Sequence, residues 1–258
     1  MSLTLLVFIL FGLFVGSFIN VCIDRLPRGQ SIISPPSHCP ICNRKLSILD
    51  LVPLLSYVWL RGRCRYCRTP IPLRLPLVEG ATALLFAFLF WRFGFGLELV
   101  ILLIYTSLLI IIFFVDLEHQ LVLDRVTYPG VAIALALSFF SPGLKEAGLL
   151  VEGAVGQALS ALAGGIFGLA FMALPFVIYR RGMGMGDIKL GALIGLMTGY
   201  PLAFLAVILS WILGGLLGAL LLILKIKKRK DPIPFAPFMV ISTLITLVWG
   251  QAIWQWYF

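Results

Sequence analysis

Residues 97–115 read LELVILLIYTSLLIIIFFV, an uninterrupted run with a single charged side chain, Glu98. A spanning helix needs about 20 predominantly apolar residues, and this run has that length. Comparable runs recur along the whole chain, which has 258 residues, of which 61% are hydrophobic and 12% charged. The mean hydropathy of +1.07 excludes a water-soluble fold. Because the runs are continuous and do not alternate with polar residues, they predict spanning helices and exclude the strands of an outer-membrane barrel.

Eight such runs, separated by helix breakers, predict about eight transmembrane helices. We expect them near 2–22, 76–93, 97–115, 126–140, 151–179, 188–199, 202–224 and 235–256. The runs at 126–140 and 188–199 are short, and the second could be a partial span. The sequence therefore predicts an all-α polytopic membrane protein with a small polar domain, residues 23–75, between its first two helices.

The distribution of basic residues predicts how the chain is oriented. Eighteen of the 20 lysines and arginines fall in four loops, 23–75, 116–125, 180–189 and 225–230. Lysine and arginine gather on the cytoplasmic side of membrane proteins, so we place these loops in the cytoplasm and both termini outside. The same rule explains the net charge of +9 without a nucleic-acid partner.

Two C-x2-C pairs in the polar segment form the strongest metal-binding signal. Cys39 and Cys42 make the first pair, and Cys64 and Cys67 make the second. Two such turns supply four thiolates for a structural zinc ion, which can fold a segment too small to build its own core. Two disulfides are the alternative, but disulfides are rare in the cytoplasm.

Two other residues near this segment have simpler interpretations than metal binding. Cys22, at the end of the first span, is interpreted as a small buried residue. His38 could be a rival ligand, but the four sulfurs already suffice for a closed zinc site.

Two aspartates stand out because they lie at the predicted cytoplasmic ends of spans. Asp116 directly follows the apolar run that ends at Val115, and Asp187 ends the glycine-rich stretch Gly182–Asp187. An acid at the membrane is a functional candidate, although Asp116 could simply reach water and Asp187 could cap a hinge. Alternating glycines such as Gly184 and Gly186 do not favour a helix and allow another backbone to come close.

Two carboxylates brought together share a proton, so that one can activate water while the other polarises a peptide carbonyl. That pairing is the chemistry of an aspartic protease. Nothing in the spacing of Asp116 and Asp187 brings them together, but both are predicted on the same side of the membrane.

These motifs together resemble the bacterial type IV prepilin peptidases. Residues 184–187 match the G-x-G-D signature of intramembrane aspartic proteases, and residues 116–124, DLEHQLVLD, resemble that family's other catalytic segment. The N-terminal stretches 16–21, 25–29, 35–40 and 60–65 resemble its cytoplasmic domain. The three blocks occur in the family's order over about residues 10 to 200.

The resemblance implies a function, a site and a division of the chain. It implies an intramembrane aspartic endopeptidase that removes the short basic leader of type IV prepilins and pseudopilins after a glycine, at the cytoplasmic face of the bacterial inner membrane. It implies Asp116 and Asp187 as the catalytic pair, with Gly184 and Gly186 in the loop that the substrate approaches. Residues 1–22 would be the first helix, 23–75 the zinc-binding and methyltransferase-associated domain, and 76–258 the protease domain.

The resemblance also implies that the new N-terminal residue is methylated with S-adenosylmethionine as the donor. No dinucleotide fingerprint supports that cofactor, so its binding residues stay unassigned, with Glu79 the one candidate. The chain departs from the family's pattern at Leu123, where proline is usual, and Asp124 and Glu118 are the alternatives to Asp116.

Three other functions remain open from the sequence. A monofunctional protease would lack methylation, an ion-coupled transporter would use its membrane acids as an ion pathway, and a scaffold would use the cysteine domain for docking. The oligomeric state is not predicted.

Overall fold

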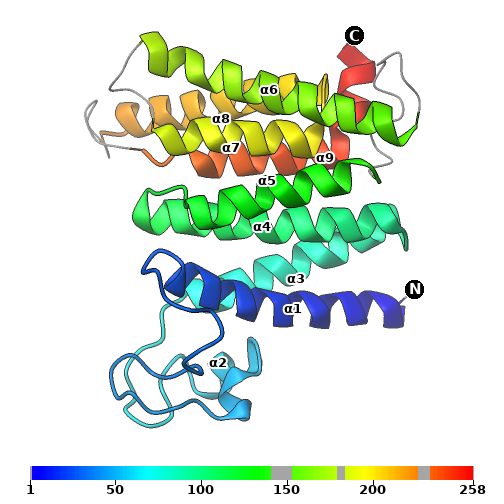
Figure 1. Cartoon of the computed structure of the whole chain (residues 1–258). Coiled ribbons are helices and arrows are strands. Elements are labelled where there is room, and N and C mark those ends of the chain that lie inside the picture. Colours follow the sequence, from blue (N-terminus) through cyan, green and yellow to red (C-terminus); the bar gives the residue numbers. More distant parts are fainter. Residues whose placement is uncertain (1, 141–152, 179–183, 226–232, 258) are drawn as a thin grey trace. The chain divides into compact units, whose positions relative to one another are not determined.

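A computed structural model describes residues 2–140, 153–178, 184–225 and 233–257, and in these ranges every regular element is a helix (Figure 1). In chain order the long helices are α1 (Ser2–Arg25), α3 (Arg74–Phe93), α4 (Leu97–His119), α5 (Asp124–Ser138), α6 (Ala154–Ile178), α7 (Met185–Thr198), α8 (Leu202–Ile223) and α9 (Ala236–Tyr257). The segment between α1 and α3 holds a short 3-10 helix, η1 (Ile48–Leu51), and the five-residue helix α2 (Leu55–Trp59). The predicted all-α fold is confirmed.

Six of these helices are long and apolar enough to cross a bilayer, namely α1, α3, α4, α6, α8 and α9. The predicted multi-pass membrane protein is therefore confirmed at this level. Helix α5 has 15 residues and α7 has 14. At 1.5 Å per residue they are about 21 to 23 Å long, less than the ~30 Å hydrocarbon core. Because α5 and α7 are shorter than the hydrocarbon core, the count of eight crossings stays a prediction.

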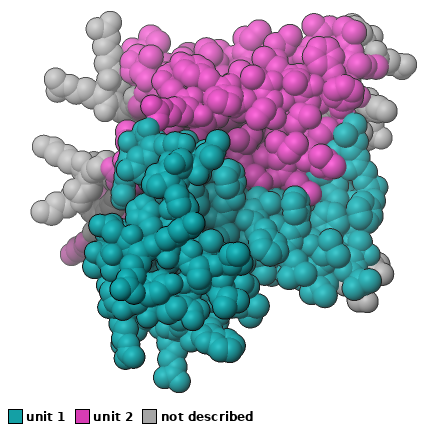
Figure 2. Space-filling model, turned by 60° about the horizontal axis from the view of Figure 1, so that its bottom comes forward, with its two compact units in different colours: residues 1–99 teal, residues 100–258 magenta. Residues whose placement is uncertain are grey.

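The chain divides into two compact units, residues 1–99 and 100–258, which Figure 2 colours teal and magenta. In the first unit α1 packs along α3 through Gly12 and Gly16. A Cβ atom on Gly12 would lie 2.6 Å from the Cα of Ala83, and one on Gly16 would lie 2.7 Å from the Cα of Glu79. Only glycine fits at such a contact, so these two positions set how closely the helices approach.

The second unit contains a similar contact between α6 and α7. Gly164 and Gly168 on α6 face Gly191 and Gly195 on α7, and a Cβ atom on Gly195 would collide with the carbonyl oxygen of Gly164. Both pairs follow the small-x-x-x-small spacing that lets membrane helices pack backbone to backbone. Helix α7 is thereby held along α6, and its first turn carries Asp187.

Part of the orientation argument concerns residues that the structure does not describe. Arg180, Arg181 and the basic residues at 227–230 lie outside the described ranges. The orientation of the chain therefore stays a prediction from the charge distribution.

We predict that Gly195→Ala lowers the stability of the protein by about 1 to 3 kcal/mol, because the added methyl group must displace the backbone of α6. The measurement is thermal unfolding of the purified protein in detergent micelles. Gly215→Ala on α8 is the matched control, since a Cβ there meets nothing within 4 Å. Equal stability of the two variants would contradict the proposed role of the glycine contact.

Candidate functional site

The four predicted cysteine ligands lie together in the first unit. Their sulfur atoms are all within 4.8 Å of one another, and the Cys39 and Cys67 sulfurs are 3.7 Å apart. Four sulfurs placed tetrahedrally at about 2.3 Å from a zinc ion would be about 3.8 Å from one another, so the cluster fits that ion. The described cysteines are free thiols, and Cys22 is buried on α1 away from the cluster.

The two C-x2-C turns have the same local structure, which explains why the sequence motif is repeated. In each turn the N–H of the first cysteine donates to a carbonyl five residues later, from Cys39 to Arg44 and from Cys64 to Thr69. The residue after the second cysteine, Asn43 or Arg68, adopts a positive φ, and its N–H donates back to the first cysteine's carbonyl. His38 lies outside the sulfur cluster, with its Nδ1 atom 3.1 Å from the carbonyl oxygen of Pro36.

Hydrogen bonds and neighbouring sulfurs shift the acidity of the clustered thiols. Hydrogen bonds from Thr69 lower the pKa of Cys67 to about 6. At Cys42 a backbone hydrogen bond from Arg44 favours the thiolate, but desolvation and the neighbouring sulfurs raise its pKa to about 11. Four thiolates at this spacing therefore need a positive ion among them.

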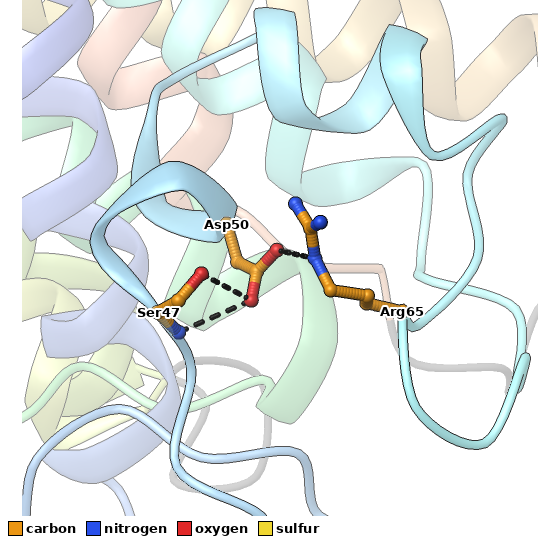
Figure 3. Close-up of polar contacts among 3 residues, drawn as sticks. All are labelled: Ser47, Asp50 and Arg65. Atoms are coloured by element: carbon orange, nitrogen blue, oxygen red, sulfur yellow. Dashed lines mark hydrogen bonds and ion pairs between the residues drawn. The ribbon is translucent and has the colours of Figure 1, made fainter.

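A buried carboxylate on η1, Asp50, joins the second cysteine turn to the start of that helix (Figure 3). Asp50 accepts a 2.6 Å hydrogen bond from Nε of Arg65, which lies between Cys64 and Cys67, and accepts two more from the N–H and hydroxyl of Ser47. Its side chain is 3% exposed. Burial alone would raise the pKa of Asp50, but Arg65 and Ser47 outweigh it and hold that pKa below its usual range. Asp50 therefore stays ionised and ties the second cysteine turn to Ser47 and η1.

A cavity of about 470 Å³ lies in the first unit, between the cysteine turns and the adjoining ends of α1 and α3. Its polar lining includes Asn20, Asp24, Arg74 and Glu79. The Oδ1 atom of Asn20 is buried without a hydrogen-bond partner, and Glu79, 8% exposed, accepts a 2.8 Å hydrogen bond from the N–H of Leu54. The cavity is lined by four arginines, Arg25, Arg28, Arg65 and Arg74, as well as by carboxylates, so it suits a small polar ligand that carries charges of both signs.

As a candidate for cofactor binding the sequence indicated only one residue of this cavity, Glu79, whereas Cys39 and Cys64 were indicated as metal ligands. The lining comes from α1, from both cysteine turns, from α2 and from α3, so no contiguous motif describes it. The signal that could have found it is Asn20, a polar residue inside an apolar span.

The second unit brings Asp116 and Asp187 near enough for their negative charges to act on each other. Asp116 is in the last turn of α4, is 5% exposed, and accepts a 3.1 Å hydrogen bond from the N–H of Ala236, the first residue of α9. Asp187 is in the first turn of α7, and its own N–H donates to the carbonyl of Gly184. Three helix ends therefore converge on this pair.

The two glycines before Asp187 differ in their surroundings. A Cβ atom on Gly186 would lie 2.8 Å from the Cβ of Val122. The close neighbour that requires glycine at position 186 is therefore Val122 of the same chain. Around Gly184 a Cβ atom would meet only the Asp187 carboxylate and the Gly186 nitrogen, at 3.7 and 3.9 Å. Neither glycine adopts a positive φ. Their predicted role in substrate approach stays a prediction.

Asp124, the alternative to Asp116, has a different partner. Asp124 is the first residue of α5, and its carboxylate forms a 2.6 Å ion pair with Nζ of Lys189. The same Nζ atom lies 5.1 Å from the centre of the Tyr128 ring. Both charged side chains are partly exposed. Asp124 therefore ties α5 to α7 and is not paired with Asp187.

Comparison with known proteins gives the same family for both units. A model described as the bacterial peptidase A24 N-terminal domain matches residues 10–93, and one described as the type IV leader peptidase family matches residues 103–219. A relative from Aeromonas hydrophila is 34% identical over 272 residues, which cover 96% of this chain and 91% of the relative. A relative from Bacillus subtilis (strain 168) is 34% identical over 248 residues, with 96% and 95% covered. Both are named prepilin leader peptidase/N-methyltransferase. No solved structure matches the chain.

We predict that Cys39→Ser removes the bound metal, because one hydroxyl cannot replace a thiolate in a closed four-sulfur site. Elemental analysis of the purified protein should find about one zinc ion per chain in the wild type and a large loss in the variant. Cys22→Ala, which alters a buried cysteine outside the cluster, should keep its zinc. A full complement of zinc in Cys39→Ser would refute the assignment of the cluster.

Proposed function

This chain belongs to the type IV leader peptidase family, and on that premise we propose that it removes the leader of prepilins and pseudopilins and then N-methylates the new first residue. One observation carries the proposal: relatives named for both activities match 96% of the chain. Each compact unit also has features suited to one of the two steps. The first unit has a ligand-sized cavity, and the second has an interacting pair of carboxylates.

For cleavage, we assign Asp116 and Asp187 as the catalytic pair. Two neighbouring carboxylates share one proton, so the ionised member can take a proton from water while the protonated member donates to the scissile carbonyl oxygen. The hydroxide equivalent adds to the carbonyl carbon, and the C–N bond then breaks as the amine nitrogen takes up a proton. The N–H of Ala236 holds the Asp116 carboxylate in place during these transfers.

For methylation, we assign the cavity of the first unit to S-adenosylmethionine. The bound cofactor would supply a methyl group on a positively charged sulfonium, for transfer to the amine that cleavage exposes. Glu79 offers a buried carboxylate for the cofactor's positive charge, and the Oδ1 atom of Asn20 offers an unpaired acceptor. The cavity volume lies within the ~300 to 1,000 Å³ of small-molecule sites.

The zinc ion is assigned a structural role. Four thiolates fill its coordination sphere, leaving no position for water or substrate. Cys39 and Cys64 line the cavity, so the metal would hold two parts of its wall together.

We also keep the eight-span arrangement as part of the proposal. In it α5 and α7 complete the crossings, both termini lie outside, and the catalytic pair and the zinc segment face the cytoplasm of a bacterial inner membrane. The charge distribution supports this orientation, because the basic loops then share one side. The leader of the substrate is basic and would be retained on that side as well.

Of the alternatives, a protease without methylation is the nearest. The match of the N-terminal domain and the cavity beside the cysteine turns favour the bifunctional enzyme. The relatives that match 96% of the chain are named as enzymes, and no observation favours a transporter or a scaffold.

We predict that Asp116→Ala and Asp187→Ala each reduce leader cleavage by about 10²- to 10⁴-fold, since each removes one half of the acid–base pair. Asp124→Ala should change cleavage less than about tenfold, because it breaks only a partly exposed ion pair. The measurement is mass spectrometry of a prepilin peptide incubated with each variant in detergent. Full cleavage by Asp116→Ala or Asp187→Ala would overturn the catalytic assignment.

We predict that Glu79→Gln weakens S-adenosylmethionine binding by about 10- to 100-fold, because a charge-assisted contact is lost. The amide oxygen of glutamine can still accept from the Leu54 N–H, so the local structure should persist. Binding is measured by calorimetry, and cleavage and methylation by mass spectrometry. Cleavage should remain in Glu79→Gln, whereas Asp187→Ala should bind the cofactor and methylate a peptide supplied without its leader. Unchanged cofactor affinity in Glu79→Gln would remove Glu79 from the site.

A further inference from the structure

The polar segment between α1 and α3 contains a stretch that is almost without charge. Residues 46–60 read LSILDLVPLLSYVWL, in which Asp50 is the only charged side chain. That carboxylate is buried and paired with Arg65, so the stretch presents no charge at its surface. Basic residues flank it on both sides, with Lys45 before it and Arg61 and Arg63 after it, all exposed.

The two short helices of this stretch expose large apolar side chains. On α2, Ser56 and Tyr57 face the cavity of the first unit, whereas Leu55, Val58 and Trp59 are exposed, Trp59 by 84%. The exposed three have the i, i+3, i+4 spacing of one helix face. Exposed Ile48 and Leu49 of η1 add to them. An apolar surface with a tryptophan and basic flanks is typical of a segment lying in a membrane interface.

The position of α2 beside the spanning helices puts this surface at membrane depth. Helix α3 has 20 residues, about 30 Å, which matches the hydrocarbon core. Leu54, directly before α2, donates to Glu79, and Glu79 lies five residues, or about 8 Å, along α3 from its first residue. In Figure 1, α2 lies alongside the C-terminal part of α1 and not beyond its end.

From the depth, the apolar face and the basic flanks together, we propose that residues 46–60 dock into the lipid bilayer at the boundary between headgroups and acyl chains. We call this stretch the interfacial loop. Leu55, Val58 and Trp59 enter the acyl region, while Lys45, Arg61 and Arg63 contact anionic headgroups. The bilayer is the occupant that the geometry favours, because the spanning helices hold this surface where lipid is the surrounding medium.

The docking has a consequence for the cavity. Ser56 and Tyr57 line the cavity on the opposite face of the same helix, so docking would hold one cavity wall at the membrane surface. A substrate whose new N-terminus emerges from the bilayer would meet the cavity there. This consequence rests on the proposed function, but the docking itself does not.

The test uses the full chain in vesicles of phosphatidylcholine and phosphatidylglycerol, with and without bromine on the acyl chains. Bromine quenches tryptophan fluorescence at short range, and the difference between wild type and Trp59→Phe isolates the signal of Trp59. We expect brominated lipid to quench that difference signal and acrylamide in the water phase to leave it largely unquenched. Quenching by acrylamide and not by brominated lipid would overturn the proposal. So would shielding from acrylamide that appears only when a prepilin peptide is added, because the substrate would then be the occupant.

A second measurement keeps the proposal testable if Trp59→Phe perturbs the fold. Hydrogen exchange of the interfacial loop should increase in Leu55→Ser/Val58→Ser in the same vesicles, because the serine pair weakens docking. Ile33→Ser, which alters an exposed isoleucine outside the loop, is the matched control and should leave that exchange unchanged. Equal exchange in the double variant and the wild type would count against docking. Neither readout depends on cleavage or methylation, so failure of this proposal and failure of the proposed function are distinguishable.

Discussion

Close backbone contact at glycine is the interaction on which both compact units depend. Helices in a bilayer gain little from burying apolar side chains, because lipid is as apolar as they are, so close packing must supply the attraction. Gly12 and Gly16 allow it between α1 and α3, and the facing glycine pairs allow it between α6 and α7. A single methyl group at these positions would separate the helices.

These contacts also position the chemistry. Gly16 lies against the backbone of Glu79, so the α1–α3 contact sets where that carboxylate enters the cavity. Gly191 and Gly195 hold α7 along α6, and the first turn of α7 presents Asp187 near Asp116. The ion pair between Asp124 and Lys189 also links α5 to α7, two residues after Asp187. The functional groups therefore stand on helix ends that are held rigidly by packing, an arrangement that limits their movement.

Much of the fold and part of the site follow from local sequence. The positions of the long helices were predicted to within a few residues, since an apolar run of a given length has few alternatives in a bilayer. The cysteine cluster was predicted because each C-x2-C turn prepares two ligands by itself. Of the cavity's cofactor contacts only Glu79 was predicted, and the exposed apolar face of α2 was overlooked inside a segment judged polar as a whole. The packing of Gly186 against Val122 was missed because the two residues are 64 positions apart.

By itself the sequence determined the helical membrane fold, the four-cysteine cluster and the family, because hydrophobic length and ligand spacing are properties of short segments. Only the tertiary structure decided which carboxylates interact: it pairs Asp124 with Lys189 and brings Asp116 and Asp187 into range of each other. It also decided that polar groups from α1, the cysteine turns and α3 enclose one cavity. Proximity between distant segments depends on how helices pack, and packing is determined by side-chain shape at contacts that no single segment contains.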